Sequence, residues 1–585
     1  MFEQIIDPIA GSLVLSALCA ALPLVLLFVL LGAFRVKAPQ AAVASLVLSI
    51  ALAVVGWKMP LGQALSGTAE GLVYGLFPIL WILVNALWVY RLTVATPWFA
   101  VLGQTIRSIT SDHRILAILI AFGFGALLES LAGFGAPVAI AAAMLIAAGM
   151  TPLKSAVVAL IANTAPVAFG AMAAPVIALS GVTGLPVDDI AKMAGRQGLV
   201  ALIVPLVLVY VVDGRRGLKQ TWPVAVMAGI VFAMTQFVIS NYFAIELTDV
   251  IAAIVTVGAV LVMLRFWQPA ETITSSADDD AAALTRETVG ATRRNDAAGG
   301  PAADRFSAKT SVTEAVARTA TSGSHHHDDA PEQDTTRPSG RHILMATAPY
   351  LIIIMIFSLA QIPAIKAWLT SVGSVTFHWP GLDVTDAAGE PVAAQMFKFD
   401  HLKATGTLLL ISGLFTMALY KVKPAKGWAI YKEGVYQLRW TIVTVSTVLA
   451  LSFVMSLSGQ TTTMGVALAS AGGFFAVLSP VIGWIGVALT GSDTSSNSLF
   501  GQLQVTAATQ TGLSPVLMAV SNSSAGALGK MVSVQNLAVA AAAAGLEGGE
   551  GTLFRKLLGW SLGLLVLMAG LVLLQSTPVL GWMVP

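Results

Sequence analysis

Residues that could bind a small charged solute occur in two polar stretches of an otherwise apolar chain. The first runs from Glu129 to Pro175 and reads ESLAGFGAPVAIAAAM and then IANTAPVAFGAMAAP; the second runs from Ser456 to Gln504 and reads SLSGQTTTMG and then LTGSDTSSNSLFGQLQ. Lipid cannot satisfy free backbone amides, so such residues at membrane depth are expected where broken helices line a protected cavity. The two stretches predict a transporter with two half-sites.

The composition places the chain in a membrane. Of its 585 residues, 56% are hydrophobic and only 11% are charged, which is far from the profile of a soluble globular protein. The formal net charge of +2 comes without a Lys/Arg stripe carrying interleaved aromatic residues, so we exclude a nucleic-acid partner. Cys19 is the single cysteine, which excludes an intrachain disulfide and a cysteine-based metal site.

The apolar runs predict about 12–14 transmembrane helices, because a bilayer core needs about 20 apolar residues per crossing. The first run has no basic segment before it and is longer than a signal-peptide core, so we expect it to remain as a membrane helix. Lys and Arg cluster at residues 35–37, 215–219 and 421–439, which we assign to the cytoplasmic face. The N-terminus and residues 362–403 then face outward.

Residues 268–340 are rich in Ala, Asp, Thr, Ser, Gly and Arg and contain almost no large apolar side chains. Such a composition cannot bury a core, so we expect a disordered cytoplasmic linker. It would separate an N-terminal membrane half, residues 1–267, from a C-terminal half, residues 341–585. The three histidines His325 to His327 could form a weak metal-binding tract, but we favour a solvated linker because no second ligand cluster accompanies them.

The two halves show a similar order of polar features. Gly133 precedes Asn163 by 30 residues in the first half, and Gly459 precedes Gly491 by 32 in the second. This order is typical of inverted repeats in transporters. The alternative is that small residues only allow close helix packing. We favour a polar cavity, because the hydrogen-bonding side chains at these breaks would otherwise need partners in lipid.

Several motifs occur in order along both halves. They are GFGAP at 133–137, LIANTAPVAFGAM at 160–172, GSDTSSNSLFGQLQ at 491–504, GKMVSVQN at 529–536 and LFRK at 553–556. Together they resemble the L-lactate permease family of bacteria. The resemblance implies import of L-lactate and related 2-hydroxymonocarboxylates such as glycolate, by proton symport across the cell inner (plasma) membrane. It also implies an all-α polytopic fold of the ion-transporter superfamily, with two inverted repeats, re-entrant hairpins and broken helices at the midplane.

The implied substrate is a small monoanion, so its site needs donors that favour an anion. Helix N-termini present free amides and a positive dipole end, and the breaks at NTAP and SDTSSN could each open a half-helix toward the midplane. We expect the polar residues of the two breaks to face each other. The candidate substrate-binding residues are Asn163, Thr164, Ser492, Thr494, Ser495, Asn497, Lys530 and Gln535. The residues expected to break the helices are Gly133, Gly135, Pro137, Pro166, Gly459 and Gly491.

Within this set, Lys530 is the expected fixed cation for the substrate carboxylate, because it matches the family motif. A lysine that snorkels from a helix end is the alternative. Gln535 could supply a further donor, or it could serve ordinary hydrogen bonding between helices.

Proton coupling needs a group that changes its charge within the membrane. Glu129 and Asp493 are the candidates, because each is a carboxyl group beside a polar break. The alternative for Asp493 is a helix N-cap, and that for Glu129 is a structural ion pair with Lys154 or Arg114. The remaining acidic residues near predicted spans lie at their edges, and we expect them to be interfacial: Asp112, Asp213, Glu246 and Asp249.

The chain departs from the usual family pattern at Ser130, Leu131, Ala136 and Val534. These differences leave open the choice among lactate, glycolate and another small carboxylate. Sodium coupling is an alternative to proton coupling, because Ser, Thr, Asn and Asp oxygens at broken helices also suit Na⁺.

An intramembrane enzyme is the competing class. The sequence contains no HExxH, no GxSxG and no glycine pattern of a dinucleotide or phosphate-binding loop, so we expect neither catalysis nor a cofactor. The two-half organisation fits alternating access better than a fixed pore. The expected partners are the lipid bilayer, the carboxylate and its coupling ion, and a homodimer is compatible with them.

Overall fold

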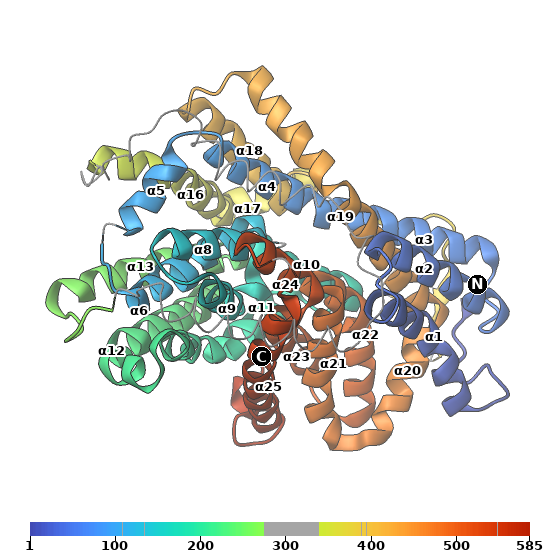
Figure 1. The fold of residues 1–585 in the computed structure, drawn as a ribbon. Helices are drawn as coiled ribbons and strands as arrows, with labels where there is room; N and C mark the ends of the chain where they lie inside the picture. The colour runs from blue at the N-terminus through green and yellow to red at the C-terminus, as the bar shows by residue number, and fades with distance from the viewer. Residues whose placement is uncertain (108, 134, 274–338, 388, 393–394, 547) are drawn as a thin grey trace, which may run out of the picture.

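The structure is a computed structural model that describes residues 1–585 except 108, 134, 274–338, 388, 393–394 and 547 (Figure 1). Helices dominate the described residues, as the sequence predicts. The expected linker at 268–340 lies mostly outside the described residues, and the histidine tract lies wholly outside them.

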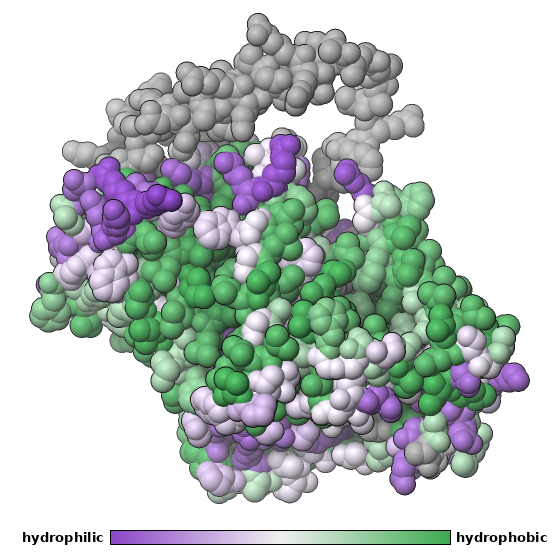
Figure 2. Space-filling view, turned by 90° about the horizontal axis from the view of Figure 1, so that it is seen from below, coloured by the Kyte–Doolittle hydropathy of each residue, from purple (hydrophilic) through white to green (hydrophobic). Residues whose placement is uncertain are grey.

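Ten helices of the described part of the chain are long and apolar enough to cross a membrane, or up to eleven if one bent pair is a single span. The sequence-based number was higher because it included shorter apolar helices, such as Ala136–Ala147 and Val534–Ala543. Figure 2 shows a broad hydrophobic band across the molecule, with hydrophilic side chains gathered toward its edges. Such a band is what the hydrocarbon layer of a bilayer requires.

The helices build two apolar cores. The smaller core joins helices from the start of the chain to helices from its second half, at the right of Figure 1. Its elements are α1 (Leu13–Gly32), α2 (Ala38–Val55), α3 (Leu61–Tyr74), η1 (Gly75–Leu80), α4 (Trp81–Val94), α19 (Pro424–Ser458) and α20 (Gln460–Leu468). α3 lies directly on α19, since a Cβ atom added to Gly71 would be 2.5 Å from the Cα atom of Ala450. Small residues permit this close approach.

The larger core surrounds a first hairpin, which consists of α6 (His113–Leu116), η2 (Ala117–Phe124), α7 (Gly125–Ala132) and α8 (Ala136–Ala147). The chain reverses at Gly133 and Gly135, whose φ angles of +39° and +86° favour glycine. The two arms begin and end together, because the His113 ring is 3.0 Å from the carbonyl oxygen of Ala148. α8 is about 18 Å long and cannot cross a bilayer alone. This pair is the first of the expected re-entrant hairpins.

A second hairpin consists of α21 (Phe475–Thr490) and α22 (Asp493–Thr511), which follow η7 (Ala469–Phe474). Gly491, with φ of +74°, ends α21, and the hydroxyl of Ser492 accepts the amide of Ser495 to cap α22. The N-cap of α22 is therefore Ser492 and not Asp493, which corrects the alternative stated above for Asp493.

Each hairpin is followed by an interrupted helix. After the first, α9 (Pro152–Ala162) breaks at Asn163 and continues through η3 (Val167–Phe169) into α10 (Gly170–Thr183), with a bend of 66°. After the second, α23 (Pro515–Gly529) ends in η8 (Lys530–Val532) before α24 (Val534–Ala543).

This element order corrects one correspondence drawn from the sequence. Gly491 takes the place of Gly133 and Gly135 at a hairpin tip, and the break at Lys530 takes the place of the break at Asn163. Gly459, with φ of +90°, instead ends α19 and lies against Gln4 and Trp57 in the smaller core. Gly459 thus breaks a helix as expected, between α19 and α20, but it is not the counterpart of Gly133.

Helix α12 (Val204–Tyr242) folds back on itself at Asp213 and Gly214, because Gly229 lies against Leu202. The two hairpins enter from opposite ends of its second arm, residues 215–242. At one end, Arg114 at the base of the first hairpin contacts Asp213. At the other end, Arg196 binds Asn241 of α12 and the carbonyl of Met583, beside the base of the second hairpin. The tips therefore approach the middle of the protein from opposite faces.

The remaining elements surround these parts. The helices are α5 (Trp98–Arg107), α11 (Val187–Gln197), η4 (Gly198–Leu202), η5 (Ile245–Leu247), α13 (Thr248–Phe266), α16 (Gly340–Gln361), α17 (Pro363–Gly373), α18 (Thr405–Leu419), α25 (Glu550–Gln575) and η9 (Gly581–Met583). Strand β1 (Phe2–Glu3) pairs in parallel with β3 (Val384–Thr385), and β2 (Val375–His378) pairs antiparallel with β4 (Met396–Phe399). The β1–β3 pair puts the N-terminal strand on the same face as residues 375–399.

A buried arginine ties the base of the first hairpin to its surroundings. The Arg114 guanidinium is 2.6 Å from Asp112 and 3.3 Å from Asp213, and it donates to the backbone carbonyl of Glu271. Asp112 caps the start of the span His113–Leu131, at the span edge that the sequence predicted, and is fully buried there. Glu271 itself is exposed, and hydrogen bonds from Gln220 and Arg216 hold the pKa of its carboxyl below the ordinary value.

Replacing Arg114 with Met should destabilise the protein strongly. Asp112 would stay buried without its counter-ion, and removing one partner of a buried pair typically costs about 3–5 kcal/mol. The midpoint of thermal unfolding of the purified protein measures the effect. The matched control is Arg216→Met, which breaks an exposed pair with Glu271 and should change the midpoint little. Equal shifts in the two variants would contradict the assignment of Arg114 as the anchor.

Candidate functional site

The centre of the candidate site is an ion pair between Glu129 and Lys530. Glu129 lies on α7 one turn before the first hairpin tip, and Lys530 lies at the break after α23. The Lys530 Nζ atom is 2.5 Å from Glu129 Oε1, and the two residues are only 6% and 2% exposed. The expected ion-pair partners of Glu129, Lys154 and Arg114, are thus wrong: Lys530 holds this place, and Arg114 is bound to Asp112 and Asp213.

The first interrupted helix supplies the other contacts of the Glu129 carboxylate. Asn163, at the break after α9, donates from Nδ2 to Glu129 Oε2 over 2.9 Å. Gly170 approaches from the far side of the break, where an added Cβ atom would lie 3.0 Å from Glu129 Oε1. The carboxylate is therefore held by one residue from each interrupted helix and leaves no room for a side chain at Gly170.

Side chains at the start of α24 form hydrogen bonds to the backbone at the Lys530 break. The backbone carbonyl of Lys530 accepts the Ser533 hydroxyl at 2.9 Å and Asn536 Nδ2 at 3.1 Å. The Oδ1 atom of Asn536 is buried and has no hydrogen-bond partner among the described residues. It faces the first hairpin tip, 3.3 Å from the position of a Cβ atom on Gly135. A buried, unused acceptor thus lies close to the Lys530 break.

The second hairpin brings a further carboxyl group to the same interrupted helix. Asp493, in the first turn of α22, accepts the Ser523 hydroxyl at 2.6 Å, and Lys530 is close enough to act on it electrostatically. Asn497, one turn later, donates to the carbonyl of Pro175 at 3.2 Å, just past the break in the first interrupted helix. Polar side chains of the second hairpin therefore contact both interrupted helices.

The other sequence-predicted residues are distributed around this centre. Thr164 donates its hydroxyl to Ile161, and Thr494 and Ser495 are buried in the first turn of α22. Gln535 is exposed and lies against Gly491 at the second tip. The predicted direct facing of the NTAP and SDTSSN breaks is replaced by an arrangement in which Asn163 meets Glu129 and Asn497 meets Pro175.

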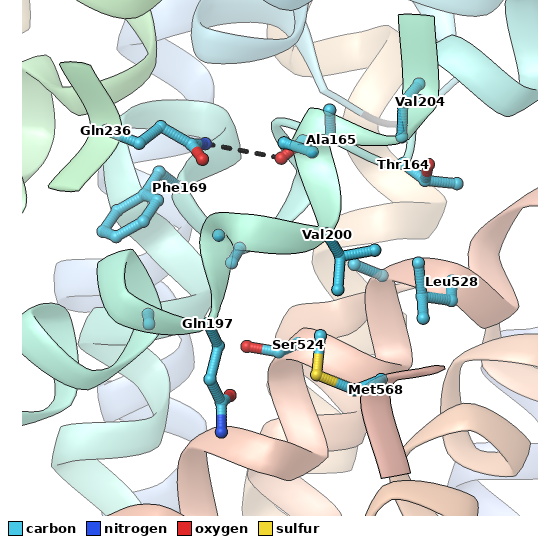
Figure 3. Close-up of a pocket in the computed structure, with 15 residues that line it drawn as sticks. Thr164, Ala165, Phe169, Gln197, Val200, Val204, Gln236, Ser524, Leu528 and Met568 are labelled. Atoms are coloured by element: carbon cyan, nitrogen blue, oxygen red, sulfur yellow. Dashed lines mark hydrogen bonds between the residues drawn. The ribbon is translucent and has the colours of Figure 1, made fainter. Parts of the chain in front are cut away.

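A small cavity of about 40 Å³ lies beside the break in the first interrupted helix (Figure 3). Four polar residues contribute to its wall: Thr164, Gln197, Gln236 and Ser524. In Figure 3 Gln236 reaches the carbonyl of Ala165, and the hydroxyl of Ser524 is directed toward Gln197. The cavity is large enough for water.

Comparison with known proteins decides the family. A family model described as L-lactate permease matches residues 16–300 and 303–579. The chain belongs to the L-lactate permease family. It is therefore a multi-pass transporter of the bacterial cytoplasmic membrane and not an enzyme, as its sequence predicted.

Curated members of the L-lactate permease family cover the whole chain. The L-lactate permease of Bacillus subtilis strain 168 is 37% identical over 604 aligned positions, which span 100% of both chains. The glycolate permease GlcA of Escherichia coli K12 is 38% identical over 587 positions, which span 98% of each. Among solved structures, Neisseria gonorrhoeae MtrF, of a class of antimetabolite efflux pumps, covers 94% of this chain and 97% of its own with 12% identity and a TM-score of 0.45.

Sequence reasoning missed three polar residues that this family member places near the ion pair: Asn522, Ser523 and Asn536. Ser523 holds Asp493, and Asn522 donates to Asn497 Oδ1 at 3.0 Å. The sequence contained a signal for Asn536. After the break at Lys530, Ser533 stands three residues before Asn536, and this spacing is typical of a serine that caps the start of a helix. The SNSS run at 521–524 reads as ordinary helix-packing residues, and only its tertiary neighbours distinguish it.

A double-mutant cycle should reveal the coupling between Glu129 and Lys530. Lys530→Met leaves a buried carboxylate without its cation, so we expect a loss of about 3–5 kcal/mol in stability. Combining it with Glu129→Gln removes both charges, and the double variant should be more stable than Lys530→Met alone. Thermal unfolding of the four proteins gives the cycle. Additive losses would show that the two charges do not interact.

Proposed function

We propose that this family member imports a small 2-hydroxymonocarboxylate, L-lactate or glycolate, together with one proton. The buried Glu129–Lys530 ion pair carries the proposal. The family relatives named L-lactate permease and glycolate permease support the substrate class.

Charge balance explains why an anion and a proton would travel together. In the empty site, the negative charge of Glu129 neutralises Lys530. A substrate carboxylate that takes over Lys530 would leave Glu129 as a buried, uncompensated charge, which costs several kcal/mol. Proton uptake by Glu129 removes this cost. Binding one monoanion and one proton restores the neutral site, and neither step alone does so.

The residues around the ion pair offer complementary groups for a 2-hydroxy acid. When Glu129 is protonated, Lys530 Nζ and Asn163 Nδ2 become donors for the substrate carboxylate. Asn536 Oδ1 then supplies the acceptor for the vicinal hydroxyl, because a buried acceptor without a partner is costly until a donor reaches it. Glu129 comes from residues 1–267 and Lys530 from residues 341–585, so both proposed halves contribute to the site.

Transport measurements on purified protein in proteoliposomes test the proposal. Radiolabelled L-lactate should accumulate under an inward proton gradient and not under an inward Na⁺ gradient, and glycolate should compete. Accumulation driven by Na⁺ would assign the coupling ion to sodium. No lactate flux under any gradient, in protein shown to be folded, would overturn the substrate assignment.

Variants of Lys530 and Glu129 test substrate binding and proton coupling separately in the same assay. Lys530→Ala should weaken substrate binding by about 10–100-fold, as expected for the loss of one charge-assisted contact, whereas Lys192→Ala, in a surface pair with Asp189, should not. Glu129→Gln should retain lactate counterflow and lose accumulation driven by protons. Normal affinity in Lys530→Ala, or normal accumulation in Glu129→Gln, would remove that residue from the mechanism.

Replacing Asn536 should reduce selectivity for the substrate hydroxyl. The readout is the ratio of inhibition constants for propionate, which lacks the hydroxyl, and L-lactate. In Asn536→Ala this ratio should fall by about tenfold, the value of one hydrogen bond. Asn85→Ala removes another buried asparagine, on α4, and should leave the ratio unchanged. An unchanged ratio in Asn536→Ala would show that another group binds the hydroxyl.

A further inference from the structure

A second buried carboxyl group, Asp249, lies near the site and has no role in the exchange described above. It is in the first turn of α13, at the edge of a candidate span, and is 0% exposed. Its Oδ1 atom accepts Gln236 Nε2 at 2.8 Å, and its Oδ2 atom has no hydrogen-bond partner among the described residues.

Among the described residues, the elements that pack most closely against α13 supply no cation that pairs with Asp249. They are α7, α10, α12, η2 and η5. Glu129 on α7 is linked to Asp249 through Gln236, which also donates to the carbonyl of Ala165, two residues after the Asn163 that binds Glu129. Glu246 on η5 is a further acid, bound to Thr405. The basic residues of α12 near its bend lie about 30 Å along the helix from Gln236. No ion pair of Asp249 occurs among the described residues.

Two neighbouring acids with one cation cannot both be charged at low cost. Lys530 neutralises Glu129, whereas Asp249 has no counter-ion among the described residues, so a carboxylate at Asp249 would be a buried, uncompensated charge. A proton on Asp249 removes that cost.

The cavity of Figure 3 is lined by residues that contact, or are chain neighbours of residues that contact, each of the two carboxyl groups. Gln236, which binds Asp249, is on its wall. Thr164 and Phe169 also line it, and their chain neighbours Asn163 and Gly170 contact Glu129. Buried side-chain oxygens of Gln197 and Gln236 have no partners among the described residues, so water in the cavity would be well bound.

Asp249 is on the side of the cavity that the topology predicts to be external. Glu246, three residues before Asp249, accepts the hydroxyl of Thr405, which begins α18 shortly after the segment 375–399. That segment shares its face with the N-terminal strand. The opposite end of α13 leads to Glu271 at the face of Arg114 and Arg216.

We propose that Asp249 is the external loading group for the coupling proton and that it delivers this proton to Glu129 through water in the cavity lined by Thr164 and Gln236. The proposal rests on proton symport as the proposed function. The O–H bond of the Asp249 carboxyl breaks and leaves a carboxylate that Gln236 stabilises. Cavity water relays the proton, an O–H bond forms on Glu129, and Lys530 is released to bind the substrate anion.

The test compares two modes of L-lactate transport in proteoliposomes. In Asp249→Asn, accumulation under an inward proton gradient should fall by about tenfold or more, because the loading acid is absent. Counterflow at equal pH, which needs substrate binding and reorientation but no net proton movement, should stay within about twofold of the wild type. Glu246→Gln is the matched control, an acid one turn away that should retain both modes.

The outcomes distinguish a failure of the Asp249 relay from a failure of the proposed transport function. Normal proton-driven accumulation in Asp249→Asn would overturn the relay, and so would loss of counterflow, which would make Asp249 a structural residue. Failure of the wild type itself to use a proton gradient would overturn the proposed function and the relay with it.

A second variant covers the case in which Asp249→Asn does not fold. Gln236→Met removes the donor to Asp249 and keeps the carboxyl group. The pH profile of accumulation should then move by about one unit toward alkaline pH, because the carboxylate loses a hydrogen bond. An unchanged profile would overturn the proposal.

Discussion

Irregular backbone cannot face lipid, and this constraint organises the centre of the protein. Two hairpins and two interrupted helices leave free carbonyl and amide groups in the membrane interior, and nearby side chains bind several of them. Asn497 binds the carbonyl of Pro175, and Ser533 and Asn536 bind that of Lys530. The Asn497–Pro175 contact and the Glu129–Lys530 ion pair each join an early segment of the chain to a late one. The polar site is therefore built from both parts of the chain.

Opposite charges are also paired where these segments contact each other. Glu129 and Lys530 are 401 positions apart in the chain, and their contact joins the first hairpin to the second interrupted helix. A buried pair of this kind adds little net stability compared with apolar packing, but leaving either member unpaired is costly. A ligand that replaces one member must therefore bring a compensating charge or proton. In the proposed transport, selectivity for an anion with a proton would follow from the number of charges in the site.

The sequence predicted the parts of this site that depend on local chemistry. The helical class, the turn at Gly133 and Gly135, the break at Asn163 and the turn at Gly491 all follow from residues whose backbone preferences are readable in place. The partner of Glu129 was predicted wrongly and the burial of Asp249 was not predicted, because both depend on which helix faces which across hundreds of positions. Gly459 was misread for the same reason, since a glycine that ends a helix in the smaller core has the same local sequence signature as one at a hairpin tip.

The neutrality of the Glu129–Lys530 pair has an electrical consequence. An empty site carries no net charge, and a site loaded with one anion and one proton carries none either. Moving an uncompensated charge through 100 mV changes its energy by about 2.3 kcal/mol. Because the site of this transporter would be neutral both when it moves loaded and when it returns empty, neither movement would require electrical work against the membrane potential. Membrane voltage would then neither drive nor slow the exchange, and uptake would depend on the pH difference across the membrane.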